Sequence, residues 1–234
     1  GFETITSGDL MIRGSRINDL LPEKRPTSMI FQNYALFPHM NVRQNIRFGL
    51  EVKGMAAAEA DRKVDRIIDK LGLSDVADMR PNNLSGGQRR RLDVALGIIG
   101  NPELIFLDEP TTGFDPEARR AFWSLIKSLR NDGATIVLTT HYLDEAEALA
   151  DRVAVINKGV IVEISTPADL GGRATSQATV QWRDGDQIKF EKTDNPTALV
   201  SSLATRFNGE VPELVVTRPS LEDIYLEMIG GVHE

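Results

Sequence analysis

Two adjacent carboxylates, Asp108 and Glu109, directly follow the apolar run 104–107. A short unbroken apolar run predicts a buried strand of a parallel sheet, and ligands bind beyond the carboxyl ends of such strands. Asp108 is suited to hold Mg²⁺, partly through water, and Glu109 to orient and deprotonate an attacking water. A plain structural role, in which the pair caps the next helix, also fits this pattern.

A histidine follows the next strand-like run. Residues 135–138 are apolar or β-branched, and Thr139, Thr140 and His141 come directly after them. Because neighbouring parallel strands end at the same edge of a sheet, His141 can reach the same phosphate as Glu109. A single histidine at a strand end is also an ordinary hydrogen-bonded polar residue, and the sequence leaves both interpretations open.

A glycine-rich stretch opens a predicted helix near residues 85–100. It reads Ser85, Gly86, Gly87, Gln88. Glycines let backbone N–H groups approach an anion, the serine hydroxyl adds a donor, and a helix N-terminus carries about half a positive charge. The stretch therefore predicts a phosphate site, although a simple loop before a helix has the same pattern.

Composition narrows the classes of function. The chain has 27 Lys and Arg against 34 Asp and Glu, a net charge of −7, and no cysteine. A mildly acidic chain without a dense basic stripe is a poor ligand for nucleic acid, so no nucleic-acid partner is expected. The absence of cysteine from the sequence excludes disulfide scaffolds and thiolate chemistry, and the apolar runs are too short to span a bilayer.

The elements that position these residues alternate along the chain, which predicts an α/β layered core. A short apolar strand is predicted near 29–31, and the unbroken runs 104–107, 135–138 and 153–156 suit a parallel sheet covered on both faces. Helical spacing marks 60–71, 85–100, 122–129 and 143–150. We expect a main domain over 1–172, with a helical subdomain at about 41–95, and a small α+β domain over 173–234. The small domain begins with a hairpin and ends with a helix after Ser220, which we expect to support residues 173–218.

Together these motifs resemble the ATP-binding subunit of ABC transporters over about residues 1–172. The stretch 84–88 is similar to the family's signature motif, 104–109 to its Walker B strand and 112–115 to its D-loop. His141 resembles the switch histidine, and Gln32, which follows the predicted strand 29–31, resembles the Q-loop glutamine.

The resemblance implies a P-loop NTPase-type core that binds ATP and Mg²⁺. Two such subunits pair head to tail, so that each ATP lies between the P-loop of one and the signature loop of the other. Glu109 is implied as the general base, Asp108 as a Mg²⁺ ligand and His141 as a contact to the γ-phosphate. Gln32 is implied to link Mg²⁺ and the attacking water to a loop facing an integral membrane transport subunit. The residues implied to contact ATP across the dimer interface are Ser85, Gly86, Gly87, Gln88 and Asp115. The implied location is peripheral, on the cytoplasmic face of a prokaryotic membrane.

Two features depart from the family pattern. The phosphate-binding motif Gly-x-x-x-x-Gly-Lys-Ser/Thr does not occur in the chain, and residues 1–3 resemble the family just after the P-loop helix. We therefore expect an N-terminally truncated chain, without the first strand and P-loop, that is inactive alone.

The subfamily signals also disagree. Residues 31–40 resemble solute importers, whereas 108–116, 140–146 and 219–225 resemble drug and ABC-2-type exporters, so we expect export. An importer ATPase, a soluble non-transport ABC ATPase and a catalytically silent module remain as alternatives.

Overall fold

The computed structural model describes residues 5–31 and 35–230. The chain divides into two compact units, Gly1–His141 and Tyr142–Glu234, and each is described by itself. This division falls elsewhere than our expected domain boundary at 172–173, which stays a prediction.

The first unit begins with a small antiparallel hairpin of β1 (Met11–Ile12) and β2 (Ser15–Arg16). The two residues between the strands both have left-handed backbone, with φ of 48° at Arg13 and 76° at Gly14. Two consecutive positive φ angles are what a tight hairpin turn requires. The predicted strand and glycine-containing turn in this region are confirmed.

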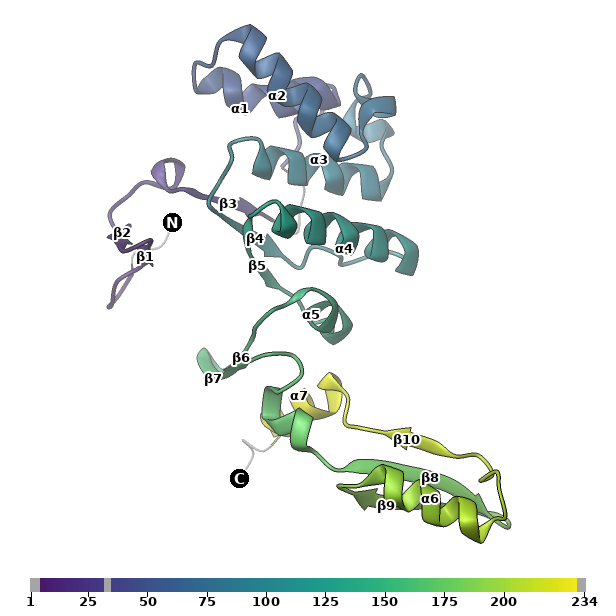
Figure 1. Cartoon of the computed structure of the whole chain (residues 1–234). Coiled ribbons are helices and arrows are strands. Elements are labelled where there is room, and N and C mark those ends of the chain that lie inside the picture. Colours follow the sequence, from purple (N-terminus) through teal and green to yellow (C-terminus); the bar gives the residue numbers. More distant parts are fainter. Residues whose placement is uncertain (1–4, 32–34, 231–234) are drawn as a thin grey trace. The chain divides into compact units, whose positions relative to one another are not determined.

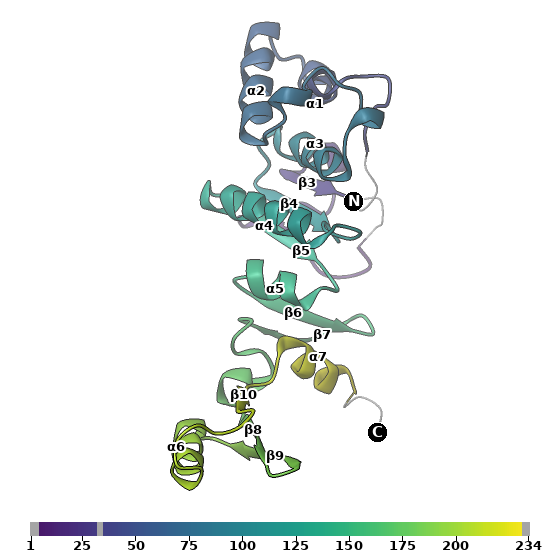
Figure 2. The same ribbon diagram turned by 90° about the vertical axis from the view of Figure 1, so that its right-hand side faces the viewer.

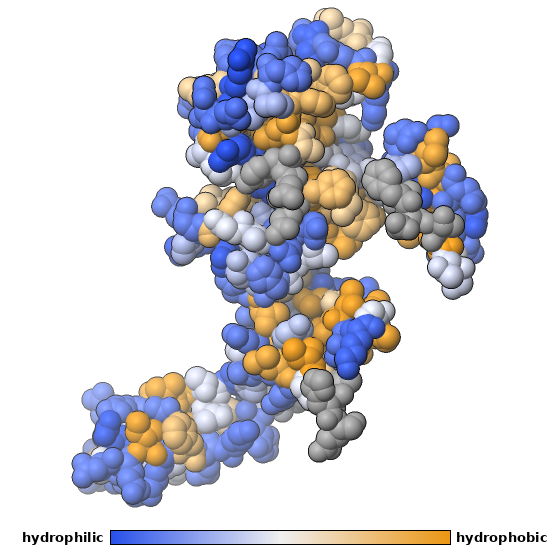
Figure 3. Space-filling view, turned by 180° about the vertical axis from the view of Figure 1, so that it is seen from behind, coloured by the Kyte–Doolittle hydropathy of each residue, from blue (hydrophilic) through white to orange (hydrophobic). Residues whose placement is uncertain are grey.

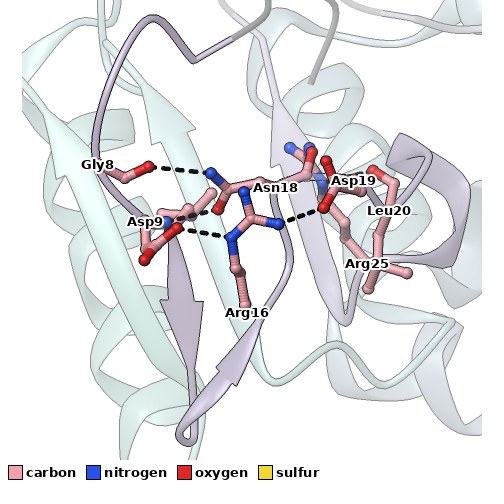
Figure 4. A network of polar contacts seen from close by, with 8 residues as sticks. Gly8, Asp9, Arg16, Asn18, Asp19, Leu20 and Arg25 are labelled. Atoms are coloured by element: carbon pink, nitrogen blue, oxygen red, sulfur yellow. Dashed lines mark hydrogen bonds and ion pairs between the residues drawn. The ribbon is translucent and has the colours of Figure 1, made fainter.

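Polar contacts hold the chain around this hairpin (Figure 4). Arg16 Nε donates to Asp9 Oδ1 at 2.6 Å, and Arg16 Nη1 donates to Asp19. The Asn18 side chain donates to the Gly8 carbonyl at 3.1 Å. These groups are exposed, so the network fixes the path of the loop and adds little to the stability of the unit.

A three-stranded parallel sheet forms the centre of the first unit (Figure 1). Its order is β3 (Thr27–Ile30), β4 (Leu104–Asp108), β5 (Thr135–Thr139). The crossovers carry α3 (Gly86–Ile98) and α4 (Pro116–Asn131), which contact one another, and α3 packs on β3. Because the strands follow one another in chain order and parallel crossovers are right-handed, both helices lie on the same face of the sheet.

The opposite side of this sheet is open, contrary to our expectation of a sheet covered on both faces. Met29 pairs with Phe106, and Phe106 with Val137, in one row across the three strands. These side chains are 52%, 36% and 45% exposed. On the other face Ile30 and Leu107 are buried. Because the strands follow one another in chain order and each crossover is right-handed, α3 and α4 lie on the same face of the sheet. The other face is therefore exposed.

Gly97 lets α3 approach the sheet closely. A Cβ atom placed there would lie 2.6 Å from Cδ1 of Ile30. A larger residue at this position would force either the Ile30 side chain or α3 to shift.

The remaining helices of the first unit are α1 (Val42–Val52) and α2 (Ala57–Lys70), which pack together (Figure 2). A capping box joins Asn41 and Gln44 at the start of α1. The predicted apolar stripe of α2 is confirmed, because Ala60, Val64 and Ile68 are buried. Short 3₁₀ turns at Pro22–Lys24, Ser74–Val76 and Pro81–Asn83 connect the elements.

The second unit opens with α5 (Leu143–Leu149), followed by β6 (Val153–Asn157) and β7 (Val160–Ser165). Our expectation that 153–156 joins the parallel sheet is wrong, because β6 pairs antiparallel with β7 in a sheet of two strands. Lys158 and Gly159 have φ of 49° and 80°, the turn that closes a two-residue hairpin. Figure 3 shows apolar side chains gathered over this hairpin, where Ile156, Val160, Ile161, Val162 and Ile164 are exposed.

The last helix, α7 (Leu221–Gly230), belongs to a cluster with α5 and β6. The Ser220–Asp223 capping contact predicted from the sequence is present, since Asp223 N donates to Ser220 Oγ at 3.1 Å. The buried residues of the cluster are Ala146, Val155, Leu170, Leu221 and Ile224. Leu170 comes from the 3₁₀ segment Leu170–Thr175.

Residues 178–217 form a separate antiparallel sheet in the order β10 (Val215–Thr217), β8 (Ala178–Asp184), β9 (Gln187–Thr193). The helix α6 (Pro196–Arg206) covers it. Their own buried cluster consists of Val180, Trp182, Leu203 and Val211. The predicted hairpin and helix are confirmed. The helix α7 buries its apolar face in the other cluster, and our expectation that it supports residues 173–218 stays a prediction.

Candidate functional site

Asp108 and Thr139 lie opposite one another at the carboxyl ends of β4 and β5. Thr139 Oγ1 donates to Asp108 Oδ1 at 2.6 Å. The bond is short because the acceptor is a carboxylate. It fixes one carboxylate oxygen at the edge of the sheet where ligands of parallel sheets bind.

Glu109 lies one residue beyond the end of β4, in left-handed backbone with φ of 41°. This conformation is costly for a residue with a side chain and persists only where surrounding contacts impose it. The Glu109 amide donates to the Thr139 carbonyl at 3.1 Å. Its Oε2 accepts from Thr112 Oγ1 at 3.2 Å, and its Oε1 lies 3.3 Å from Nδ1 of His141. The structure therefore brings three of the predicted residues together: Asp108, Glu109 and His141.

The signature-like stretch forms the N-terminus of α3. Ser85 Oγ accepts from Gln88 N at 3.2 Å, and Gln88 Oε1 accepts from Ser85 N at 2.9 Å. This is a capping box, which satisfies donors at the start of the helix. The predicted helix and its Ser85 cap are confirmed. Within the part of the chain that the structure describes, the hydrogen bonds of the Ser85 and Gln88 side chains stay within the helix terminus.

Asp115 is the N-cap of α4. Its Oδ1 accepts hydrogen bonds from the amides of Glu117 and Ala118, at 3.0 and 2.8 Å. The chain turns just before it at Gly113, where φ is 79°. Local helix capping therefore accounts for the position of this carboxylate.

Gln32 lies outside the described residues. The nearest described residues are Phe31 and Ala35.

The oxygen ligands at the end of β4 suit a hard cation. Asp108 supplies carboxylate oxygen beside a threonine hydroxyl, and Mg²⁺ binds one or two carboxylates while keeping several waters. Among the described residues no group of three or more His, Cys, Asp or Glu is arranged to hold a metal.

Sequence reasoning did not single out Thr139 or Thr112 as members of the cluster. The signal that identifies Thr139 is the strand register, which places it opposite Asp108. Thr112 follows Glu109 by three residues, a separation at which a turn lets the two side chains meet.

The family described as ABC transporter matches residues 1–112. The match and the α/β fold of the first unit define an ABC ATPase domain with a core of the P-loop NTPase kind. The chain thus carries an ABC transporter ATP-binding domain.

Curated relatives of the chain are ATP-binding proteins of transporters. The spermidine/putrescine import ATP-binding protein PotA of Roseobacter denitrificans is 36% identical over 202 residues, 80% of this chain and 56% of that protein. The protein of the same name from Bacillus thuringiensis is 41% identical over 171 residues, 73% of this chain and 52% of that protein.

A third relative is the xylose/arabinose import ATP-binding protein XacJ of Haloferax volcanii. It is 41% identical over 169 residues, 71% of this chain and 44% of that protein. The chain spans about half the length of these relatives. Their names support the importer alternative better than our expectation of export.

In the described residues, no helix is both long and apolar enough to cross a membrane.

Proposed function

We propose that this chain acts in an ATP-hydrolysing subunit that powers solute import through a separate membrane subunit. The observation that carries the proposal is the contact between Glu109 and His141 beside Asp108, at the edge of a parallel sheet. A carboxylate, an imidazole and a candidate magnesium ligand at one strand edge suit phosphoryl transfer to water, in which catalysis depends on positioning and charge.

Each side chain has a role in this proposal. Glu109 accepts a proton from the attacking water, and His141 holds the carboxylate at Oε1 and contacts the γ-phosphate. Asp108 binds Mg²⁺, which neutralises phosphate charge when it is bound. Gln32 is proposed to link Mg²⁺ and the attacking water to a loop that faces the membrane subunit.

The signature-like stretch acts on a second nucleotide in this scheme. We propose that two copies of the domain pair head to tail, so that residues 85–88 and Asp115 of one copy contact the ATP held by the other. The N-terminus of α3, which begins at Gly86, suits an anion. The assembly sits peripherally at the cytoplasmic face of the membrane, bound to its transport subunit.

Import is proposed rather than export on two grounds. The relatives described above carry import names, for polyamines in two cases and for pentose sugars in the third. Residues 31–40 also have the importer-like pattern. We propose a small soluble organic solute as cargo, and uptake assays with a polyamine and with a pentose distinguish the two classes.

The phosphate-binding motif is not among these 234 residues. Because its backbone amides and lysine grip the phosphates, we propose that the 234-residue polypeptide does not hydrolyse ATP by itself.

The experiment joins this chain to the P-loop segment of the Bacillus thuringiensis relative and measures Mg²⁺-dependent phosphate release. Glu109→Gln should lower turnover by ~10²–10⁴-fold, the usual contribution of a positioned base. Glu117→Gln, an exposed carboxylate on α4, is the matched control and should match the parent. Turnover of the Glu109→Gln protein within twofold of the parent would refute the proposal.

A further inference from the structure

A buried ion pair lies on α3, a turn after the signature-like stretch. Arg90 Nη1 is 3.1 Å from Asp93 Oδ2, and the two side chains are only 2% and 6% exposed. Charges removed from water to this degree are stable only where further hydrogen bonds engage them. The hydrogen-bond partners of Arg90 and Asp93 therefore show what stabilises these buried charges.

Arg90 and Asp93 form hydrogen bonds with the residues on either side of positions 32–34. Arg90 Nη1 donates to the Phe31 carbonyl at 2.7 Å, and the Asp93 carboxylate accepts a hydrogen bond from the Ala35 amide. Phe31 and Ala35 are the described residues immediately before and after positions 32–34. One ion pair thus binds the chain on both sides of these three positions.

A second buried side chain holds the continuation of the segment. Asn45 of α1 is fully buried; its Oδ1 accepts from Phe37 N at 2.8 Å, and its Nδ2 donates to the carbonyls of Phe37 and Met40, both at 3.1 Å. The path of residues 35–40 is therefore set by two helices, α1 and α3.

Arg90 also contacts an aromatic side chain of α4. Its guanidinium carbon lies 6.0 Å from the ring centroid of Phe122, within cation–π range. The Phe122 ring meets the Phe114 ring edge to face, with centroids 5.9 Å apart. Phe114 immediately precedes Asp115, so two aromatic rings link Arg90 to the N-cap of α4.

We propose that Arg90, with Asp93, is a positioning residue that couples α3 to Phe31 and Ala35, the described residues on either side of positions 32–34. This inference rests on the proposed function. When α3 moves, Phe31 and Ala35 move with it, because the planar guanidinium of Arg90 keeps the Phe31 carbonyl in one geometry and the Asp93 carboxylate holds the Ala35 amide. Neither residue touches nucleotide in this scheme.

The test replaces the pair by apolar residues of similar size, Arg90→Met with Asp93→Leu. Such replacements of buried ion pairs often preserve or raise stability, so the variant should fold. Amide hydrogen exchange is followed by NMR in the 234-residue chain. The Ala35 amide should exchange about tenfold faster or more, as expected for the loss of a hydrogen bond to a charged group, while the Ile105 amide in β4 stays as protected as in the parent.

Two further variants separate faster exchange at Ala35 from a general loosening of the fold. Arg47→Lys alters another ion pair of the same unit, with Asp61 at 2.5 Å, and should leave the Ala35 amide unchanged. Arg90→Lys keeps the charge without the planar fork and should also speed exchange at Ala35. Unchanged exchange at Ala35 in the double variant would overturn the proposed coupling.

The functional arm uses the P-loop-bearing version. The double variant should lower kcat about tenfold or more with the KM for ATP within about twofold of the parent, and should cause little further loss when combined with Gln32→Ala, because coupled residues are not additive. Faster exchange with unchanged kcat would overturn the positioning role alone. Parental turnover in Glu109→Gln would instead overturn the proposed function.

Discussion

The Nδ1 atom of His141 lies 3.3 Å from Oε1 of Glu109. The two residues follow neighbouring strands, and the Glu109 amide donates to the carbonyl of Thr139, two residues before His141. The register of β4 and β5 therefore sets the distance between carboxylate and imidazole. Side chains in such contact are expected to act as one unit.

Glu109 and His141 should accordingly show non-additive effects on ATP turnover. In the P-loop-bearing version, Glu109→Gln and His141→Ala should each lower kcat, by ~10²–10⁴-fold for the base, and the double variant should lose much less than the product of the two. His39→Ala, an exposed histidine of the same unit, is the control. Fully multiplicative losses would show that the two side chains act independently.

Thr139→Val should weaken the candidate site by removing the hydroxyl that donates to Asp108. We expect a loss of about 0.5–1.5 kcal/mol in the free energy of unfolding, the net value of one hydrogen bond, together with weaker Mg²⁺ dependence of turnover in the P-loop-bearing version. Urea titration measures the first quantity. Thr135→Val, exposed on the same strand, is the matched control; an equal loss there would mean that the Asp108 contact contributes nothing specific.

Asp93 should make the stability of the protein depend on pH. Burial raises the pKa of the Asp93 carboxyl above 3.8, although Arg90 and the Ala35 amide lower it. The folded state thus holds this proton more tightly than the unfolded state, and the stabilising contribution is lost as the pH rises through the folded pKa.

The measurement is the free energy of unfolding of the parent minus that of Asp93→Asn, from about pH 3 to about pH 7. This difference should fall as the pH rises. A difference that increases with pH would show that the attraction of Arg90 outweighs burial.

Leu221→Ala should destabilise the cluster around α5 and leave the β8–β9–β10 sheet folded. Leu221 is 2% exposed and packs in the cluster with Ala146 and Leu170, and truncating a buried leucine costs about 2–5 kcal/mol. Hydrogen exchange should rise in 143–172 and not at Val180, which belongs to the other cluster. Leu226→Ala, at a position 54% exposed, is the control; a matching rise at Val180 would contradict this division.

Local patterns in the sequence were enough to predict several elements. The Ser85 and Ser220 caps, the stripe of α2, the strand ending in Asp108 and the hairpin at Gly185 depend on residues within a few positions of one another. Helical periodicity, capping and turn formation act over this same short range, so the sequence alone determines them. The motif order was likewise sufficient to indicate the ABC ATPase domain.

Pairing partners and covered faces depended on the tertiary structure. The run 153–156 is apolar enough for a parallel strand, yet the turn at Lys158 and Gly159 returns the chain to pair with β7. The open row Met29, Phe106, Val137 follows from the side on which the crossovers run, which composition does not encode. The site shows the same limit: Thr139 joins Asp108 through strand register, and Arg90 meets Phe31 across 59 residues of chain. Such contacts form only when packing brings distant segments together, so only the tertiary structure decides them.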